Sequence, residues 1–522
     1  MVFLSSWRRQ DFDQDVALLA SNNAASRSSD DTIFVLDEKE LQSKSKARTG
    51  YLQSIHKAFV QLCNLVLAFF PSFITSMWRK DQSSDRKMRP TAYLDGLRGV
   101  AAWSVFNAHL SAVLTKSSGG AWGHSSGMHQ EIYKFPGLRL MYHGEFAVAV
   151  FFVISGYVLS MAPISAMSRS PLQADSALRK FASAAFRRTL RLFLPAWGSM
   201  FLVFILLRLN YFSSITANLD RFNVLVPGWH PITESWPERM PTVFAQLRTF
   251  LSDVFDLFVI FVPPTDPSFK LKYNAVLWTI KLEFRCSLVL YLTQLALFFC
   301  TKRARTVIMG ILIVTGLCVW SWDLPCFWTG YLFAEYARTP SSTMLPMLAR
   351  ADNGPKSRKF RASPVLYWLL LIVGAYLGSF PTWQDDQTPL YAWLIPYTPF
   401  GFVPRSRAWT ALGAAMVVFA ISRLPVLIAL YSSPVIQYLG KISFALYLVH
   451  FWLVHGLGTI IFYHVWNVFS KDVLVLKLIG FCIGYGLTLG VVVWVADIFW
   501  RFVDVPSVKL TSKVEQWFFV KQ

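Results

Sequence analysis

The chain has 522 residues, of which 54% are hydrophobic and only 15% are charged. A soluble protein would carry about a quarter charged residues, and long apolar stretches recur along this chain, which indicates a polytopic membrane protein. The net charge of +20 does not indicate nucleic-acid binding, because the basic residues gather in alternate loops, as membrane orientation requires.

Residues 1–57 are rich in Ser, Asp, Lys and Arg, and we expect a disordered cytosolic tail there. Residues 58–89 then form a predicted interfacial helix and a basic linker. The stretch 58–78 is long enough to cross a bilayer, but a central proline and polar side chains favour the interfacial interpretation. A transmembrane helix over 58–78 remains the alternative. It would place the N-terminal tail on the outer face of the membrane. The N-terminus lacks a signal-peptide core, so the first span must act as its own insertion signal.

Hydrophobic stretches between residues 90 and 505 predict an all-α fold, a polytopic membrane bundle of about ten transmembrane helices. The basic loops fall on one side of such a bundle, which places both termini and a C-terminal tail, 506–522, in the cytosol. The opposite loop 213–275 is long and includes an amphipathic stretch, 242–261. It forms either a cap or re-entrant helix, or a surface loop with one interfacial helix. The predicted spans are 94–114, 145–162, 192–212, 276–299, 306–322, 325–338, 364–380, 409–430, 442–466 and 473–500.

The first span carries an arginine and a histidine eleven residues apart, Arg98 and His109. At roughly 100° per residue they share one helix face, about 16 Å apart along the axis. Ionisable groups inside a membrane are usually functional, so His109 is a candidate proton acceptor; the alternative is a histidine hydrogen-bonded to a neighbouring helix. Arg98 could instead extend to lipid phosphates, and Asp95, one turn earlier, could pair with it.

The predicted span 276–299 contains three charged residues, each costing about 2.5–3.5 kcal/mol at the bilayer centre. Lys281 and Arg285 are four residues apart and share a face, whereas Glu283 points elsewhere. We therefore expect Glu283 to find a partner on another helix, and His109 is one candidate. The alternative is a structural ion pair that ties two helices together.

Two weaker signals lie in the second and third spans. Ser155 and Gly156 occur together in an apolar helix, where a small pair permits the close approach of another helix or of a ligand. Before the third span, a cationic cluster at the cytosolic start of the helix suits a polyphosphate, although positive-inside topology explains it equally well. This cluster consists of Arg187, Arg188 and Arg191.

The ninth predicted span contains Tyr447 and His450, which lie about one turn apart on one face. They either line a cavity or form hydrogen bonds between helices. The cysteines, by contrast, are scattered through apolar segments without a CxxC pair, so they indicate neither a disulfide framework nor a metal site. We interpret them as packing residues: Cys63, Cys286, Cys300, Cys318, Cys326 and Cys482.

Five segments, taken in order, resemble the acyltransferase-3 family of integral membrane acyltransferases: LDGLRG with its histidine, FFVISGY, RRTLRLFLP, LWTIKLEFR and GKISFALYLVH. The resemblance covers roughly residues 90–500. It implies a bundle of about ten spans that transfers an acyl group, usually acetyl from acetyl-CoA, to a hydroxyl or an amine. Many fungal members have proline or a small residue at the position of Lys281 and glycine at that of Cys286, so the extra lysine leaves the protonation of Glu283 open.

The placement of these motifs leads to a hypothesis for the roles of the residues above. His109 would act as general base, contributing about 10²–10⁴-fold, or less favourably as a transient acyl carrier, and Glu283 would orient or charge-balance it. No bound cofactor is expected; an acyl-CoA is the co-substrate, the acceptor is a small molecule or a glycan, and membrane lipid surrounds the bundle. The predicted acyl-CoA-binding residues are Arg98, Arg187, Arg188, Arg191, Ser155 and Gly156; the predicted cavity lining is Asp95, Lys281, Arg285, Tyr447 and His450.

Two other classes of function compete with an enzyme. A transporter of a polar or anionic solute would use the same buried charges, but broken helices in symmetric halves, which would favour it, are not found in the sequence. A non-catalytic scaffold would not need Arg98 and His109 on one face. The sequence therefore favours an acyltransferase, with a secondary metabolite or a carbohydrate as acceptor.

Overall fold

The computed structural model describes residues 89–115, 118–123, 132–167, 174–212, 237–261, 271–319, 321–337, 363–399, 404–469 and 473–519, with a few single positions outside these ranges. The chain divides into two units, residues 1–69 and 70–522. The predicted disordered tail and interfacial helix fall almost entirely outside the described residues.

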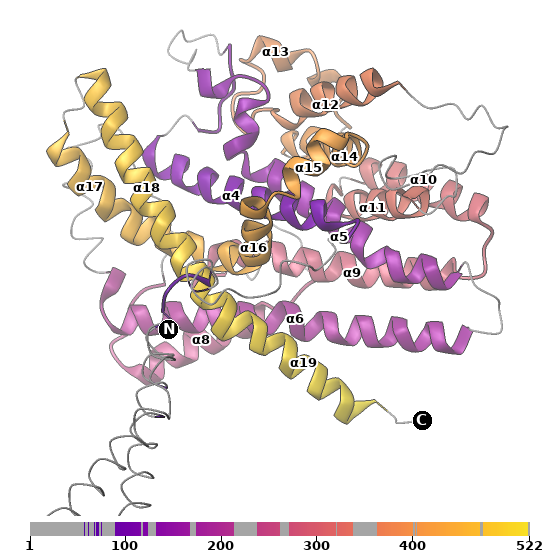
Figure 1. Cartoon of the computed structure of the whole chain (residues 1–522), viewed down its shortest axis with the longest axis horizontal. Helices are drawn as coiled ribbons and strands as arrows, with labels where there is room; N and C mark the ends of the chain where they lie inside the picture. The colour runs from indigo at the N-terminus through magenta and orange to yellow at the C-terminus, as the bar shows by residue number, and fades with distance from the viewer. Residues whose placement is uncertain are drawn as a thin grey trace, which may run out of the picture. The chain divides into compact units, whose positions relative to one another are not determined.

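Helices make up all the regular secondary structure of the described residues, which confirms the all-α prediction (Figure 1). Short 3-10 helices cover Ile132–Lys134, Leu138–Tyr142, Ala275–Leu277 and Ile395–Tyr397, and π-helices cover Val454–Gly458 and Trp500–Asp504. The α-helices are α4 (Ala92–Leu114), α5 (Gly144–Met167), α6 (Ala174–Arg208), α8 (Val243–Asp256), α9 (Trp278–Ala296), α10 (Lys302–Cys318), α11 (Asp323–Ala337), α12 (Pro364–Gly378), α13 (Pro389–Ala392), α14 (Ser406–Ile421), α15 (Pro425–Tyr431), α16 (Pro434–Leu453), α17 (Thr459–Val468), α18 (Leu474–Phe499) and α19 (Val505–Phe518).

Every predicted span contains a helix, but few of these helices are long and apolar enough to cross a membrane by themselves. Four meet that standard in the described part of the chain: Gly144–Met167, Leu178–Arg208, Pro434–Val468 and Leu474–Phe518. A fifth results if α14 and α15, which are bent by 99°, form one broken span. Helices such as α11 and α12 have 15 residues, fewer than the roughly 20 that a bilayer requires. A helical membrane protein is supported, whereas the count of about ten spans is not confirmed.

Glycines bring α4 and α16 together. A Cβ atom on Gly99 would overlap the backbone of Gly440, and one on Gly440 would overlap the backbone of Asp95. Only glycine permits so close an approach of two helix backbones. This contact explains Gly99 of the LDGLRG segment, whereas Gly96 lies against the backbone of Tyr431 in α15. The neighbouring Arg98 lines the same cavity as Gly440 of α16.

A second glycine contact joins α5 to α11. A Cβ atom on Gly156 would overlap the carbonyl oxygen of Phe327, and one on Gly330 would overlap that of Val153. Gly156 is therefore used for helix packing, one of the two alternatives that the sequence left open. With Gly156 against α11, the neighbouring Ser155 is directed to α9, where it hydrogen-bonds to Glu283.

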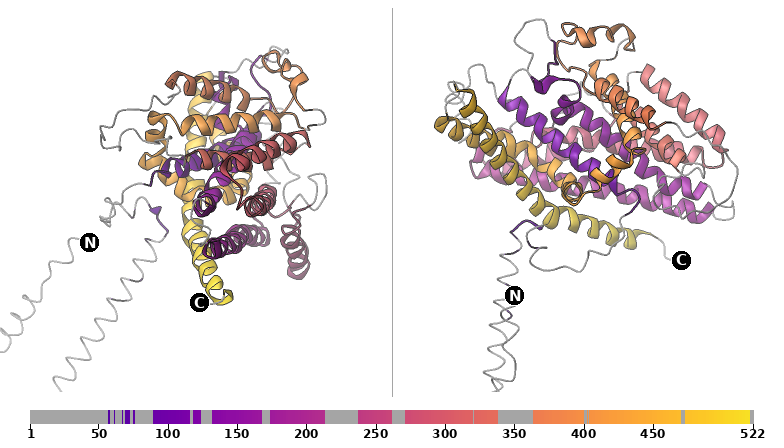
Figure 2. Two further views of the ribbon diagram at one scale, coloured as in Figure 1. Left: turned by 90° about the vertical axis from the view of Figure 1, so that its right-hand side faces the viewer. Right: turned by 45° about the horizontal axis from the view of Figure 1, so that its top comes forward.

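The C-terminal segment is a helix rather than an irregular tail. Figures 1 and 2 show α18 continuing into α19, which runs beside α6. Arg187 Nη1 lies 2.9 Å from Glu515 Oε2, and the ring of Phe186 contacts that of Phe519 at a centroid distance of 5.6 Å. Residues 506–519 thus cover part of the cationic segment of α6.

The predicted amphipathic stretch 242–261 forms α8. Thr242 caps the helix, because its Oγ1 accepts a hydrogen bond from the amide of Ala245 at 3.1 Å. The buried face is polar: Gln246 and Asp253 both hydrogen-bond to Tyr273. The exposed face is apolar and suits an interfacial helix; whether α8 caps the bundle stays a prediction. Its exposed apolar residues are Val243, Phe244, Leu247, Leu251 and Phe255.

Candidate active site

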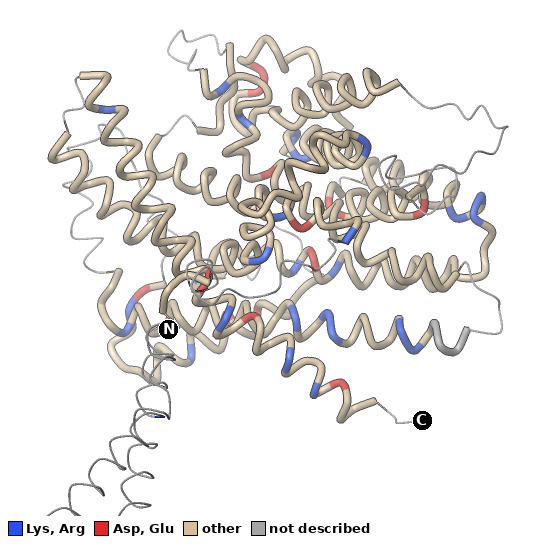
Figure 3. Tube along the Cα trace, viewed as in Figure 1, with Lys and Arg blue, Asp and Glu red and all other residues tan. Residues whose placement is uncertain are grey.

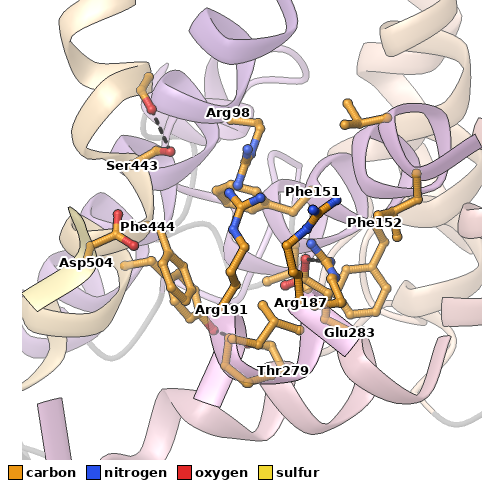
Figure 4. A pocket seen from close by; sticks show the side chains of 18 of the residues that line it. Arg98, Phe151, Phe152, Arg187, Arg191, Thr279, Glu283, Ser443, Phe444 and Asp504 are labelled. Atoms are coloured by element: carbon orange, nitrogen blue, oxygen red, sulfur yellow. Dashed lines mark hydrogen bonds and ion pairs between the residues drawn. The ribbon is translucent and has the colours of Figure 1, made fainter. Parts of the chain in front are cut away.

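A cavity of about 370 Å³ lies among α4, α5, α6, α9 and α16. Close helix packing creates it: the α4–α16 glycine contact fixes one wall, and α6 and α9 supply the opposite one. Figure 4 shows the side chains of Arg98, Arg187 and Arg191 directed into a common space. The cavity is lined by Arg98, Val148, Phe151, Phe152, Val158, Leu159, Ala184, Arg187, Arg188, Arg191, Leu192, Thr279, Ile280, Glu283, Tyr291, Gly440, Lys441, Ser443, Phe444, Tyr447 and Asp504.

The lining of this cavity is strongly cationic. It has four arginines and one lysine but only two carboxylates, Glu283 and Asp504. Figure 3 shows basic residues at intervals along α6, and three of them, Arg187, Arg188 and Arg191, line the cavity. The structure therefore brings together all four arginines that the sequence predicted to bind an acyl-CoA.

The arginines differ in how they are paired. Arg187 binds Glu515, and Arg188 Nη2 lies 2.5 Å from Glu283 Oε1. Arg98 and Arg191 form no hydrogen bond or salt bridge with the described residues. Each guanidinium has five N–H donors, so two such groups facing one cavity indicate an anionic ligand with several oxygen acceptors.

Glu283 has different partners from the one expected. Besides Arg188, it accepts a hydrogen bond from Ser155 Oγ at 3.0 Å. Glu283 thus has a partner on another helix, as expected, but this partner is Arg188 of α6 and not the candidate His109. A guanidinium is permanently charged and donates in a fixed fork, so it compensates a carboxylate in an apolar bundle better than a neutral imidazole does.

His109 lies in a group of aromatic rings outside the cavity lining. We call His109, His450 and His455 the histidine cluster. The ring centroid of His109 lies 5.1 Å from that of His450, 5.9 Å from that of His455 and 5.1 Å from that of Phe451. His109 is partly buried, whereas His450 and His455 are buried. Within the described residues, no group of three or more His, Cys, Asp or Glu side chains could hold a metal ion.

Tyr447 connects the cavity with the histidine cluster. It lines the cavity, where its ring contacts that of Phe151 at 6.2 Å, and its ring lies 5.6 Å from that of His450. Its hydroxyl lies 2.5 Å from Thr279 Oγ1 and donates to the carbonyl of Val276 at 2.8 Å. These bonds tie α16 to the beginning of α9, so Tyr447 forms the wall between the two groups.

Four of the five predicted cavity residues do not line the cavity, and three of these four are charged. Asp95 lies 3.8 Å from Arg89 rather than pairing with Arg98. Arg285 forms a salt bridge with Asp323 at 2.6 Å, which ties α9 to α11. Lys281 is fully buried and lies outside the lining. Charges at a lipid-facing or interhelical position need partners of their own, so a charged residue in a span does not by itself identify a site.

Three further predicted residues lie outside the cavity lining: Ser155, Gly156 and His450. Ser155 hydrogen-bonds to the lining residue Glu283, and the ring of His450 lies beside that of the lining residue Tyr447. Gly156 faces Phe327 on α11, so it is not placed to touch an acyl-CoA in this cavity.

The sequence did not identify two charged lining residues. Lys441 lies in the GKISF segment, and its Nζ is 4.2 Å from the ring centroid of Trp500. Asp504 lies in the π-helix after α18, beyond the last predicted span. Six residues on α16 separate Lys441 from Tyr447, which places them about 120° apart around the helix, so helical periodicity does not mark Lys441. No motif marks Asp504.

The fold and the site define a helical membrane protein with an arginine-lined cavity beside a histidine cluster. The family model for the acyltransferase domain of the acyltransferase-3 family matches residues 91–497. The chain therefore belongs to this family, as the sequence motifs predicted.

Three fungal relatives extend this comparison. Acyltransferase R4 from Phoma sp. is 31% identical over 83% of this chain and 97% of its own length. Acyltransferase clz18 from Cochliobolus lunatus is 32% identical over 81% of this chain and 95% of its own length. O-acetyltransferase PaAT-1 from Phomopsis amygdali is 28% identical over 82% of this chain and 86% of its own length. No solved structure matches this chain.

Proposed function

We propose that this acyltransferase moves an acetyl group from acetyl-CoA to a hydroxyl of a secondary metabolite or a carbohydrate. The observation that carries the proposal is the pair of guanidinium groups, Arg98 and Arg191, that face the cavity without hydrogen bonds or salt bridges to the described residues. CoA carries the phosphates that such a site suits. The similarity to a protein named an O-acetyltransferase supports the acetyl donor and the hydroxyl acceptor.

The cavity would hold the phosphates of the donor. Arg98 and Arg191 bind phosphate oxygens directly, and Arg187 exchanges Glu515 for phosphate as CoA enters. Glu283 holds Arg188 by a charge-assisted hydrogen bond, so its role in this proposal is to position an arginine rather than to orient His109.

The thioester would meet His109 beyond Tyr447. About 16 Å separates His109 from Arg98 along α4, and the pantetheine arm of CoA extends over a distance of this order. The acyl group therefore passes the wall formed by Tyr447, whose side chain has to move. The termini would lie in the cytosol, as the distribution of basic loops predicts, with the phosphates entering from that side.

His109 would act as general base. One ring nitrogen takes the proton of the acceptor hydroxyl while the oxygen attacks the thioester carbonyl, so a C–O bond forms and the C–S bond breaks. The imidazolium then returns the proton to the sulfur, and CoA leaves as the thiol. Proton transfer of this kind contributes about 10²–10⁴-fold to a rate.

Labelled acetyl-CoA tests the proposal. Membranes that contain the protein should release free CoA thiol and move the label to a CoA-free product, and the His109→Ala variant, inserted to the same level, should do neither. Normal transfer by that variant would overturn the role of His109. The acceptor class is tested by comparing metabolites and wall sugars of a deletion strain with those of its parent, for products that differ by the mass of one acetyl unit.

The transporter that the buried charges also allowed has no observation in its favour. The family assignment indicates transfer chemistry, and the carboxylates Glu283 of α9 and Asp323 and Glu335 of α11 are each paired with an arginine. Paired carboxylates tie helices together and are not arranged to bind and release a solute.

A further inference from the structure

His450 is held in a single tautomer by its own helix. Its Nδ1 lies 2.8 Å from the carbonyl oxygen of Tyr447 and 3.2 Å from that of Leu446. A carbonyl oxygen only accepts hydrogen bonds, so Nδ1 carries the hydrogen. Nε2 is then the nitrogen with the lone pair, which makes it a hydrogen-bond acceptor.

That acceptor atom has no partner of its own. His450 is fully buried, and Nε2 makes no hydrogen bond with the described residues. Buried polar atoms are nearly always hydrogen-bonded, and each exception requires an explanation. An apolar side chain would fill the same space without leaving a polar atom unsatisfied.

The neighbour best placed to satisfy this atom is His109. The two rings have a centroid distance of 5.1 Å and an angle of 48°, so they face each other without a hydrogen bond. Rotation about χ2 of a histidine is broad, and hydrogen bonds of catalytic groups are often long before the substrate binds. A rotation of the His109 ring is enough to direct one of its N–H groups toward Nε2.

The surrounding backbone is also unusual. A π-helix at Val454–Gly458 interrupts the helix directly after this segment, and π-helical turns occur frequently at functional sites. It places His455 with its ring 5.9 Å from that of His109 and 4.4 Å from that of Phe451. His455 is therefore the competing partner for His109.

We infer that His450 is the positioning residue of His109: its Nε2 accepts a hydrogen bond from the ring N–H of His109 that faces away from the acceptor. This inference rests on the proposed acyl transfer, and it gives His450 the orienting role for which Glu283 is not placed. The bond fixes the tautomer of His109, so that its other nitrogen carries the lone pair toward the acceptor hydroxyl. No covalent bond to His450 forms, and the transferred proton stays on His109 until it returns to the CoA sulfur.

Three substitutions at one position separate this role from packing. In His450→Asn the amide nitrogen retains the bond to the Tyr447 carbonyl but nothing remains at the Nε2 position. In His450→Gln an amide oxygen reaches that position and accepts a hydrogen bond. In His450→Phe the ring volume is retained without polar atoms.

We expect His450→Asn and His450→Phe to lower kcat about 10- to 100-fold, by analogy with the loss seen when the hydrogen-bond partner of a metal-bound histidine is removed. The KM for acetyl-CoA should stay unchanged, because the phosphates bind in the arginine-lined cavity. His450→Gln should retain most of the lost rate. A purely structural role would give the opposite order, with His450→Phe closest to the wild type. The measurement is the release of CoA thiol from acetyl-CoA by the full-length protein in membranes.

The matched controls are His464→Asn, at an exposed histidine of α17, and His455→Asn in the histidine cluster. Wild-type kcat in His450→Asn, or a larger loss in His455→Asn than in His450→Asn, would overturn the inference. If the wild-type protein itself releases no CoA from acetyl-CoA or from longer acyl-CoAs, the proposed function fails instead. The two failures are thus distinguished by the wild-type measurement.

Discussion

The cavity and the histidine cluster are built on the same two helices but have opposite chemistry. Both use α4 and α16, yet the cavity contains permanently charged guanidinium groups, whereas the cluster contains imidazole rings, one of them packed against Phe451. In the cavity, the N–H donors of Arg98 and Arg191 form no hydrogen bonds with the described residues. In the cluster, His450 has a buried acceptor without a partner.

This difference indicates that one helical bundle can keep the binding of the donor phosphates apart from the acyl-transfer step. A polyphosphate requires hydrated, permanently charged donors, while a general base requires a neutral ring whose lone pair is protected from water. Placed among the guanidinium groups, an imidazole would be a weaker base, because neighbouring positive charges disfavour its protonated form. Tyr447 touches both regions and keeps them apart.

The largest expected effect is that of His109→Ala. If the cluster is the reacting region, this change lowers kcat by about 10²–10⁴-fold and leaves the affinity for acetyl-CoA unchanged, because the phosphate site is intact. The measurement is a steady-state assay together with equilibrium binding of labelled CoA. Loss of binding as well would show that the two regions do not act separately.

The next largest effect is expected from Arg98→Gln. A hydrogen bond to a charged group contributes about 1.5–3 kcal/mol, so the KM for acetyl-CoA should rise about 10- to 100-fold while kcat changes little. The exposed Arg303 on α10 offers the control Arg303→Gln, which should have a normal KM. A lower kcat with an unchanged KM would assign Arg98 to the reaction instead.

Gly156→Ala tests whether this glycine belongs to either region. Its new Cβ would overlap the carbonyl of Phe327, so we expect the free energy of unfolding to fall by about 1–3 kcal/mol, with an unchanged KM. Thermal denaturation in detergent measures this. The control is Gly490→Ala, where nothing lies near the added atom. A raised KM for acetyl-CoA in Gly156→Ala but not in the control would show that Gly156 contributes to acetyl-CoA binding.

The smallest effect is expected from Tyr447→Phe, which keeps the ring between the two regions. It removes a hydroxyl that bonds to Thr279 and to the Val276 carbonyl, and a typical hydrogen bond contributes about 1 kcal/mol. We expect a lower Tm and a rate within a few-fold of the wild type. Tyr447→Ala removes the ring that lies between the cavity and the histidine cluster. A faster reaction in that variant would show that movement of Tyr447 limits the rate.

Part of this site followed from the sequence. Hydropathy alone indicated the helical membrane class, because apolar length is a local property of the chain. Helical periodicity placed Arg98 and His109 on one face and gathered the arginines of α6, since residues on one helix have positions fixed by 3.6 residues per turn. The motifs in chain order then indicated the family.

What only the tertiary structure decided was which helix meets which. Glu283 pairs with Arg188 and not with His109, and Asp504 lines the cavity without any sequence signal. A charged side chain looks the same in sequence whether it ties two helices together or faces a ligand. Its partner depends on which helices pack together, and this packing is set by contacts such as that between Gly99 and Gly440. The sequence of a single helix does not show which other helix it contacts.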